Sequence, residues 1–258
     1  MNRLDKLFQN KKENILSIYF SAGHPKLNDT ATIIETLDKS GADIVEVGMP
    51  FSDPVADGPV IQQSSLKALH NGMHVKLLFE QLASIRQKTQ IPIVLMGYLN
   101  PVLQYGIKEF CEKSNEIGID GLILPDLPPD LYLDEYKLLF EQNNLANVLL
   151  VPPQTSDARI KELDSITNGF LYIVAASSTT GAKKGFEEYQ IEYFNRLQKL
   201  QLLSPTLIGF GISSNQSFKE ACKYANGAII GSAFIKALEG NGKLESKIEG
   251  FVKDILGN

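Results

Sequence analysis

The feature that most constrains this chain is a regular alternation of short apolar segments with longer segments of helical spacing. The short segments are mostly continuous runs rich in β-branched residues, as is typical of strands buried on both faces. Strands that alternate with helices predict a parallel sheet. We expect strands at residues 15–22, 44–48, 91–98, 121–126, 147–151, 170–175, 206–211 and 227–231.

Eight strands are the number that closes a (β/α)₈ barrel. The chain has 258 residues and 43% hydrophobic content, which suits one domain with a large core. We expect a single barrel domain over 1–258, with a short N-terminal helix and a C-terminal helix packed on the outside. The structural alternative is an open doubly wound sheet, which the absence of a Gly-x-Gly-x-x-Gly motif after the first strand disfavours.

The longer segments show apolar residues on one helical face. Asp29 is expected to cap a helix that ends at Gly41. The residues that form the apolar faces of this helix, of the helices before strands three and seven, and of the last helix are Ile33, Ile34, Leu37, Val75, Leu78, Leu82, Ile85, Phe194, Leu197, Leu200, Ile248, Val252 and Ile255.

Charge and cysteine content exclude several classes of function. The formal net charge is -5, so no broad attraction to nucleic acid or to an anionic membrane is expected. Cys111 and Cys222 lie in predicted helices without the spacing of a disulfide framework or a metal site. The three histidines, at positions 24, 70 and 74, have no ligand-like neighbours, so no metal is expected. The first residues lack an apolar signal core, which favours a cytoplasmic enzyme.

The second predicted strand places a carboxylate inside an apolar run. Strand side chains alternate between faces, so Glu46 faces the barrel interior if Val45 and Val47 face the helices. Glu46 is either an ion-paired structural residue or a general acid/base whose pKa is raised by loss of solvent.

A long loop rich in Pro, Gly and Asp follows this strand over residues 48–62. The active site of a (β/α)₈ barrel lies at the carboxyl ends of its strands, where long loops are usually functional. Asp57, which precedes Gly58 and Pro59, is either a helix N-cap or a functional carboxylate. The spacing alone does not separate these two interpretations.

Two glycine-bearing turns follow strands seven and eight, at residues 209–213 and 231–233, and each leads into a short predicted helix. Glycine lets a phosphate approach the backbone closely, and helix N-termini supply N–H donors. Barrel phosphate sites recur at these two strands, so a phosphate site is expected here. A third segment, residues 177–181, offers hydroxyls after strand six. Lys183 and Lys184 follow it and either guide a phosphate into the site or form a solvated pair, which is the favoured interpretation.

The sequence at residues 46–62, Glu-Val-Gly-Met-Pro-Phe-Ser-Asp-Pro-Val-Ala-Asp-Gly-Pro-Val-Ile-Gln, resembles the signature of the tryptophan synthase alpha chain family. Segments 19–25, 96–101, 125–128 and 209–213 are similar to the family's strand ends. The resemblance covers essentially the whole chain, and it implies cleavage of indole-glycerol phosphate to indole and glyceraldehyde 3-phosphate.

The resemblance also implies roles for individual residues. Glu46 would be the acid/base that protonates C3 of the indole ring, and Asp57 would hydrogen-bond the indole N–H. Tyr19 and Tyr98 would line the ring pocket, with Tyr172 near the glycerol hydroxyls. Thr180 would also contact the substrate. The phosphate would be held by Gly181, Phe210, Gly211, Gly231 and Ser232.

One departure from the family pattern follows strand six. Many members carry an arginine there, whereas this chain keeps Thr180 and Gly181 without it. We expect closure of this loop to be tuned differently and the role of Thr180 to be kept.

The family's alpha chain works with a pyridoxal-phosphate beta chain in an αββα complex, and Asp53 and Pro54 resemble its partner contact. No cofactor is expected in this chain.

Two other functions are weighed against this one. Another phosphate-binding barrel, such as the synthase of indole-glycerol phosphate or a related isomerase, would use a catalytic lysine, and no lysine lies at a predicted strand end beside the glycine turns. A non-catalytic module that only activates a beta partner would not need both Glu46 and Asp57.

Overall fold

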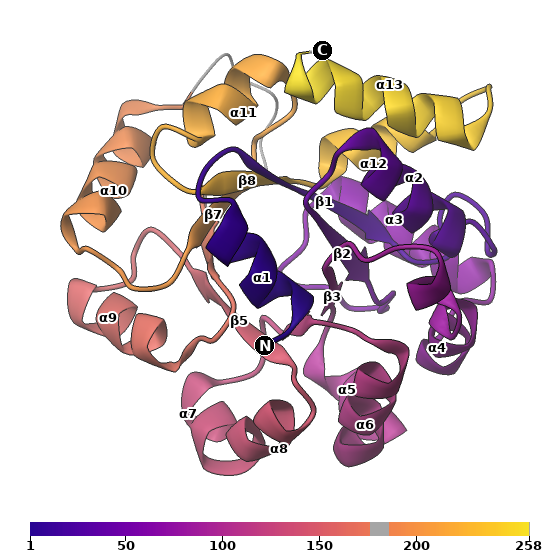
Figure 1. Cartoon of the computed structure of the whole chain (residues 1–258), viewed down its shortest axis with the longest axis horizontal. Helices are drawn as coiled ribbons and strands as arrows, with labels where there is room; N and C mark the ends of the chain where they lie inside the picture. The colour runs from indigo at the N-terminus through magenta and orange to yellow at the C-terminus, as the bar shows by residue number, and fades with distance from the viewer. Residues whose placement is uncertain (176–185, 258) are drawn as a thin grey trace.

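A computed structural model of the chain describes residues 1–175 and 186–257. Within these residues, parallel strands β1 to β8 follow one another in order around a closed barrel (Figure 1). The strands are β1 (Ile15–Ser21), β2 (Ile44–Gly48), β3 (Ile93–Met96), β4 (Gly121–Ile123), β5 (Ala146–Val151), β6 (Leu171–Val174), β7 (Thr206–Gly209) and β8 (Gly227–Ile230). The expected (β/α)₈ barrel is confirmed.

Helical segments surround the barrel and follow the strands in the alternation that the sequence predicts. They are α1 (Arg3–Asn10), α2 (Thr30–Ser40), α3 (Pro59–His70), α4 (Val75–Leu82), η1 (Ile85–Gln87), α5 (Leu99–Tyr105), α6 (Ile107–Ile117), α7 (Pro129–Leu131), η2 (Tyr132–Tyr136), α8 (Lys137–Gln142), α9 (Asp157–Ile166), α10 (Glu188–Lys199), α11 (Asn215–Ala221), α12 (Ser232–Leu238) and α13 (Leu244–Leu256). No helix in the described part of the chain is long and apolar enough to cross a membrane.

The predicted strands are found in place, but most end earlier than expected. β3 ends at Met96 because Gly97 and Tyr98 already lead into α5. The prediction extended these strands into the first loop residues that follow them. The consequence is that several functional candidates lie on loops just past the strand ends.

Helix α2 illustrates how the helices dock. Its apolar residues Ile33, Ile34 and Leu37 are fully buried, and Gly41 ends the helix in the left-handed conformation, with φ 98°. Glycine adopts this conformation without strain, so the predicted stop is confirmed. Asp29 occupies the N-cap position, as predicted, but its carboxylate makes no capping hydrogen bond to α2.

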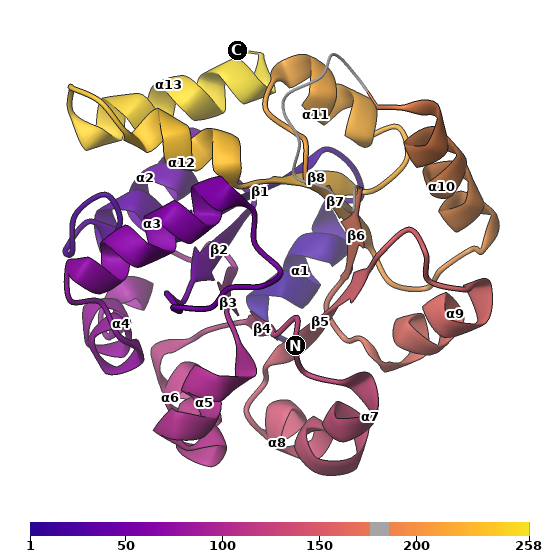
Figure 2. The same ribbon diagram turned by 180° about the vertical axis from the view of Figure 1, so that it is seen from behind.

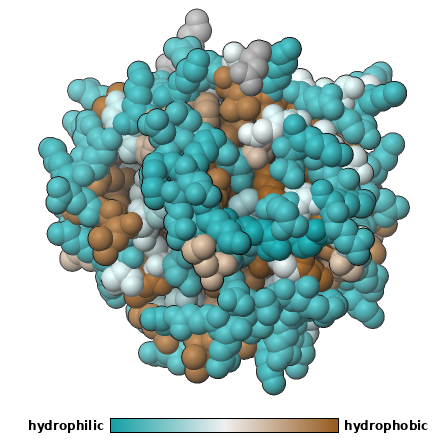
Figure 3. Space-filling view, viewed as in Figure 1, coloured by the Kyte–Doolittle hydropathy of each residue, from teal (hydrophilic) through white to brown (hydrophobic). Residues whose placement is uncertain are grey.

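The two terminal helices occupy different places, although both were expected on the outside. α13 packs on the outside of the barrel against α2 and α12. α1 instead lies across the amino-terminal end of the barrel, where Leu4 and Phe8 join the inner core (Figure 1). Burial of these two side chains contributes about 2 kcal/mol each to stability. The outward face of this end is largely hydrophilic (Figure 3).

A buried carboxylate fixes α1 to this end of the barrel. Asp120 is fully buried and accepts hydrogen bonds from the backbone N–H groups of Arg3 and Ile93, at 3.1 and 2.9 Å. The Arg3 and Arg86 guanidinium groups pair with it at 3.2 and 2.7 Å. Because the charge is both paired and hydrogen-bonded, its burial is compensated. The amino end is therefore closed, and the carboxyl end is left for chemistry.

Candidate active site

Glu46 lies inside the barrel, as the alternation along β2 predicts. Val45 and Val47 belong to the core between strands and helices, whereas Glu46 is paired in register with Tyr19 of the inner core and is fully buried. The Ser17 hydroxyl donates a hydrogen bond to Glu46 Oε1 at 2.7 Å. Burial raises the pKa of Glu46 to about 7, and the Ser17 bond opposes that rise. A carboxyl with this pKa exchanges protons near neutral pH.

Asp57 lies on the loop between β2 and α3, which crosses the carboxyl end of the barrel (Figure 2). The N-cap of α3 is Gly58, with Pro59 in the first turn, so Asp57 is not the cap. The Tyr98 hydroxyl instead donates a hydrogen bond to Asp57 Oδ2 at 3.1 Å. Burial raises the pKa of Asp57 to about 6, against the effect of the Tyr98 bond. The structure thus favours a functional carboxylate.

Tyr98 fastens this loop to the barrel. Its hydroxyl accepts a hydrogen bond from the Ala56 N–H at 2.9 Å, and its ring stacks on Phe51 with centroids 5.3 Å apart. The Asp126 carboxylate accepts hydrogen bonds from the Leu99 N–H at 2.9 and 3.1 Å, which fixes the start of α5 beside Tyr98. Sequence reasoning placed Tyr98 in the ring pocket but missed this anchoring of the loop.

Tyr19 and Tyr172 are buried on the inner face of β1 and β6. A side chain at Gly48 would collide with the Tyr19 hydroxyl, and one at Gly209 with the Tyr172 hydroxyl, so each glycine makes room for a tyrosine. Burial raises the pKa of both tyrosines, with the nearby carboxylates adding to the effect. Both phenols therefore stay neutral and offer hydroxyl groups beside Glu46.

The two glycine turns at the carboxyl ends of β7 and β8 have distinct backbones. Phe210 and Gly211 both adopt positive φ, at 71° and 81°, and a side chain at Gly211 would meet no atom within 4 Å. Positive φ is strained for phenylalanine, and such strain concentrates at functional sites. Gly231 packs against Tyr19 and precedes Ser232, which begins α12.

Helices α11 and α12 both begin after these turns, as predicted, but only α11 is capped by its own side chains. Ser214 and Ser217 form a capping box at α11. The first N–H groups of α12 receive no side-chain cap. The backbone donors after β8 are therefore the more open of the two sets.

The remaining sequence-predicted residues fall outside this cluster. Asp53 is exposed on the β2–α3 loop and Pro54 is buried, whereas the neighbouring Val55 is 85% exposed. Thr180 and Gly181 lie outside the described residues, as do the two lysines that follow them. No group of three or more metal-binding side chains occurs within residues 1–175 and 186–257.

Ser17 is the contact of Glu46 that sequence reasoning missed. The available signal was a serine inside an apolar strand, two residues before Tyr19 and on the same face. A lone strand serine is usually structural, so the signal was weak without the register of β1 against β2.

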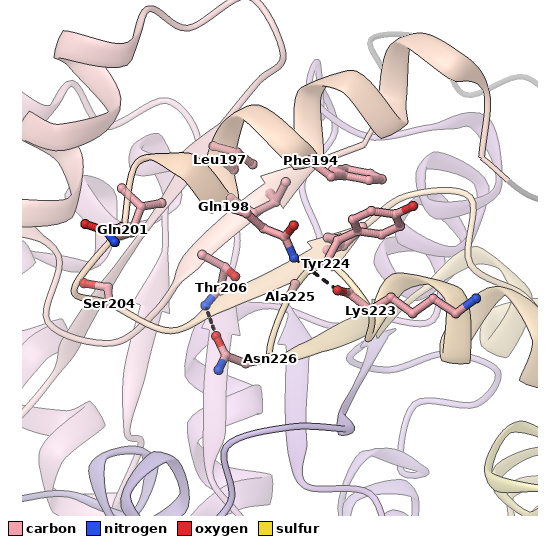
Figure 4. Close-up of a pocket in the computed structure, with 13 residues that line it drawn as sticks. Phe194, Leu197, Gln198, Gln201, Ser204, Thr206, Lys223, Tyr224, Ala225 and Asn226 are labelled. Carbon is pink, nitrogen blue, oxygen red and sulfur yellow. Dashed lines mark hydrogen bonds between the residues drawn. The ribbon is translucent and has the colours of Figure 1, made fainter.

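A separate pocket of about 310 Å³ lies on the outer wall of the barrel (Figure 4). It lies between α10 and the turn before β8, near the amino-terminal ends of β7 and β8. Gln198 bonds the Lys223 carbonyl across it at 3.1 Å, and Asn226 accepts from the Thr206 N–H at 2.8 Å. None of the candidate site residues named above lines this pocket. The pocket is therefore separate from the candidate residues at the carboxyl end of the barrel.

Known proteins resemble this chain over nearly its whole length. The family model described as tryptophan synthase alpha chain matches residues 5–254. The tryptophan synthase alpha chain of Flavobacterium johnsoniae is 56% identical over 255 residues, covering 99% of this chain and 100% of the relative. That of Bacteroides thetaiotaomicron is 49% identical over 239 residues, or 93% of each chain.

Solved structures agree with the sequence relatives. Tryptophan synthase subunit alpha from Legionella pneumophila superposes with a TM-score of 0.87 at 32% identity, covering 99% of this chain and 97% of the other. A chain of tryptophan synthase from Mycobacterium tuberculosis gives 0.88 at 29% identity, covering 98% and 96%. On this evidence the chain belongs to the tryptophan synthase alpha chain family.

Proposed function

We propose that Glu46 and Asp57 together perform the reaction of this family, the cleavage of indole-3-glycerol phosphate to indole and glyceraldehyde 3-phosphate. The observation that carries the proposal is a fully buried carboxyl, Glu46, and a half-buried one, Asp57, with raised but different pKa values of about 7 and about 6. When two titratable groups lie in environments that give them different pKa values, one can act as the acid while the other stays ionised. The chain is a carbon–carbon lyase by its family.

Glu46 acts in its protonated form and delivers its proton to C3 of the indole ring. The ring then carries positive charge as an indolenine cation. The bond from C3 to the glycerol carbon breaks, and its electron pair returns to the ring and restores indole. The 3′-hydroxyl of the glycerol chain gives its proton to the Glu46 carboxylate and becomes the aldehyde. Glu46 ends the cycle protonated, so no external acid or base is consumed.

Asp57 acts in its ionised form. It accepts a hydrogen bond from the indole N–H, and this bond strengthens as the ring gains positive charge. The Tyr98 hydroxyl that donates to Asp57 Oδ2 supports the ionised form and fixes the carboxylate on its loop. Asp57 therefore stabilises the cation that Glu46 creates.

The substrate lies among residues of several strand ends. Tyr19 and Tyr98 line the ring pocket, and Tyr172 lies near the glycerol hydroxyls, with Thr180 as a further substrate contact. The burial of the three tyrosines beside the carboxylates supports these tyrosine roles. An apolar pocket with a few polar groups is what a ring with one N–H requires.

The phosphate is held at the ends of β6, β7 and β8, by Gly181, Phe210, Gly211, Gly231 and Ser232. The support comes from the left-handed turn at Phe210 and Gly211 and from the uncapped start of α12. Backbone N–H groups that are not used within the fold are available to an anion.

The chain needs no cofactor for this step, because the protonated ring is its own electron sink. We also propose that it works in the cytoplasm with a pyridoxal-phosphate beta chain, as an αββα complex. The β2–α3 loop supports this partner, since Asp53 and the neighbouring Val55 are exposed beside Asp57. Pro54 belongs to the same contact but is buried within this chain.

The rival phosphate-binding barrels would need a lysine in the site. None of the buried polar side chains in the described part of the chain is a lysine. A non-catalytic module is the second rival, and turnover by the isolated chain separates it from an enzyme.

The test of the proposed function is the Glu46→Gln variant. The amide keeps the shape of the side chain but cannot transfer the proton, so we expect glyceraldehyde 3-phosphate release to fall by about 10²–10⁴-fold. Release is measured from indole-3-glycerol phosphate, with and without a beta chain. The matched control is Glu116→Gln on the exposed surface of α6. Retention of more than roughly a tenth of wild-type turnover contradicts the role of Glu46.

A further inference from the structure

A buried serine contacts Glu46 from inside the barrel. Ser17 and Glu46 are both fully buried, and the Ser17 hydroxyl donates to Oε1 at 2.7 Å. Oε2 of the same carboxylate is buried and has no hydrogen-bond partner among the described residues. The hydrogen bond from Ser17 therefore holds Oε1 in place, whereas Oε2 has no hydrogen bond to a described residue.

The register of β1 and β2 explains how Ser17 reaches Glu46. Tyr19 lies opposite Glu46, and Ser17 lies opposite Ile44, so the hydrogen bond runs diagonally from the amino-terminal side. The inward neighbours Ile15 and Ile44 are apolar and fully buried. A hydroxyl in such a layer is costly without a partner, and Glu46 supplies that partner.

We propose that Ser17 is a positioning residue for Glu46, which holds Oε1 in place so that Oε2 is the oxygen that exchanges the proton with the substrate. This inference rests on the proposed role of Glu46. Ser17 itself touches neither the ring nor the glycerol phosphate, because it lies one layer closer to the closed end of the barrel.

The hydrogen bond has a second effect on the protonation of Glu46. A hydroxyl that donates to a carboxylate favours the ionised form and opposes the burial that disfavours it. The other titratable groups around Glu46 are Tyr19, Tyr172 and Asp57. The pKa of each tyrosine is raised, so the tyrosines are neutral, and Asp57 carries the other charge of the site. Ser17 therefore moderates the acidity of Glu46 without adding charge.

The Ser17→Ala variant removes the hydrogen bond and little else. Because Glu46 must be protonated to act, kcat falls at high pH when Glu46 ionises. We expect this high-pH fall to move upward by roughly one pH unit in the variant. We also expect kcat at the optimum to drop by about three- to tenfold, with KM unchanged within about twofold. Ser17→Thr keeps the hydroxyl and should restore both values.

Ionisation of Glu46 can also be followed without turnover. The infrared band of its protonated carboxyl, identified by its absence in Glu46→Gln, should persist to higher pH in Ser17→Ala than in wild type. Ser17→Cys keeps the volume with a much weaker donor and should shift the band in the same direction. It serves as the second variant if the alanine substitution prevents folding.

The control is Ser114→Ala, which removes a fully buried hydroxyl from α6, outside the site. It should leave the high-pH fall and the infrared band where they are in wild type. Unchanged titration and unchanged kcat in Ser17→Ala overturn the inference. If Glu46→Gln is inactive at the same time, the role of Glu46 survives and only the positioning role of Ser17 fails.

Discussion

At the scale of single residues, the site contains two carboxylates with different surroundings. Glu46 lies on a strand inside the barrel, and its contact is a neutral hydroxyl. Asp57 lies on a loop, and its contact is a phenol that also bonds the loop backbone. The pKa of each group is raised by burial, to about 7 for Glu46 and about 6 for Asp57. This order allows one to be protonated while the other is ionised.

The pH dependence of turnover follows from that order. In the proposed mechanism Glu46 acts in its protonated form, so we expect activity to fall as pH rises through about 7. Asp57 acts in its ionised form, so we expect activity to fall as pH falls through about 6. We expect a bell-shaped profile of kcat/KM with a narrow optimum between these values. A rise of activity that continues well above pH 7, toward about 9, would contradict the requirement for a protonated Glu46.

The role of Asp57 is tested separately by Asp57→Asn. The amide lacks the charge that we propose stabilises the indolenine cation, so we expect kcat to fall by roughly 10²-fold and KM to change much less. The low-pH fall should also disappear from the profile. Asp134→Asn, on the exposed surface of η2, is the matched control. A rise in KM with unchanged kcat would show that Asp57 only binds substrate.

At the scale of elements, the sequence predicts what depends on periodicity and fails where contacts depend on the register between strands. The inward direction of Glu46 follows from alternation along one strand. The hydrogen bond from Ser17 to Glu46 cannot be predicted from alternation, because the two residues are not opposite each other in the β1–β2 register. The Asp57–Tyr98 bond likewise joins residues 41 positions apart, on the loops after β2 and β3.

Helix and strand ends show the same division. The stop of α2 at Gly41 follows from the conformation that glycine adopts. Most strand ends were placed too late, because residues such as Tyr98 keep an extended backbone after the ladder has ended. The position of α1 across the barrel end depends on Asp120, more than a hundred residues away, which no local pattern contains.

The anchoring of the β2–α3 loop leads to a prediction for Tyr98→Phe. The variant keeps the ring that stacks on Phe51 but loses the hydroxyl that bonds Asp57 and Ala56. Without the donor, the pKa of Asp57 rises further, so the low-pH fall of activity should move upward. We also expect kcat to decrease about tenfold and proteolysis within the loop to become faster.

The matched control for this variant is Tyr105→Phe, at the last residue of α5 and packed against Phe79 and Phe110. It should leave the pH profile and the proteolysis of the loop unchanged. If Tyr98→Phe behaves like Tyr105→Phe, the Tyr98 hydroxyl does not hold the loop.

At the scale of the whole molecule, the two ends of the barrel have different tasks. The amino end is closed by α1 and the Asp120 cluster, which stabilise the fold. The carboxyl end carries the carboxylates, the glycine turns and the β2–α3 loop. Such a separation lets the loops respond to ligands and partners without loosening the core.

The last prediction concerns activation by a beta chain. The β2–α3 loop places Asp53 and Val55 on the surface, two to four residues from Asp57. A partner that binds this surface in one loop conformation favours that conformation, and each tenfold of activation requires about 1.4 kcal/mol of preference for it. We expect the isolated chain to be a weak enzyme whose turnover increases when a beta chain is titrated in.

Asp53→Ala combined with Val55→Ser should lose most of the stimulation by the beta chain while keeping the turnover of the isolated chain. The control is Leu203→Ser, which changes an equally exposed apolar residue, 89% accessible, on the segment that leads into β7 at the opposite end. Full stimulation of the double variant, or loss of stimulation in Leu203→Ser, would show that the partner acts through another surface.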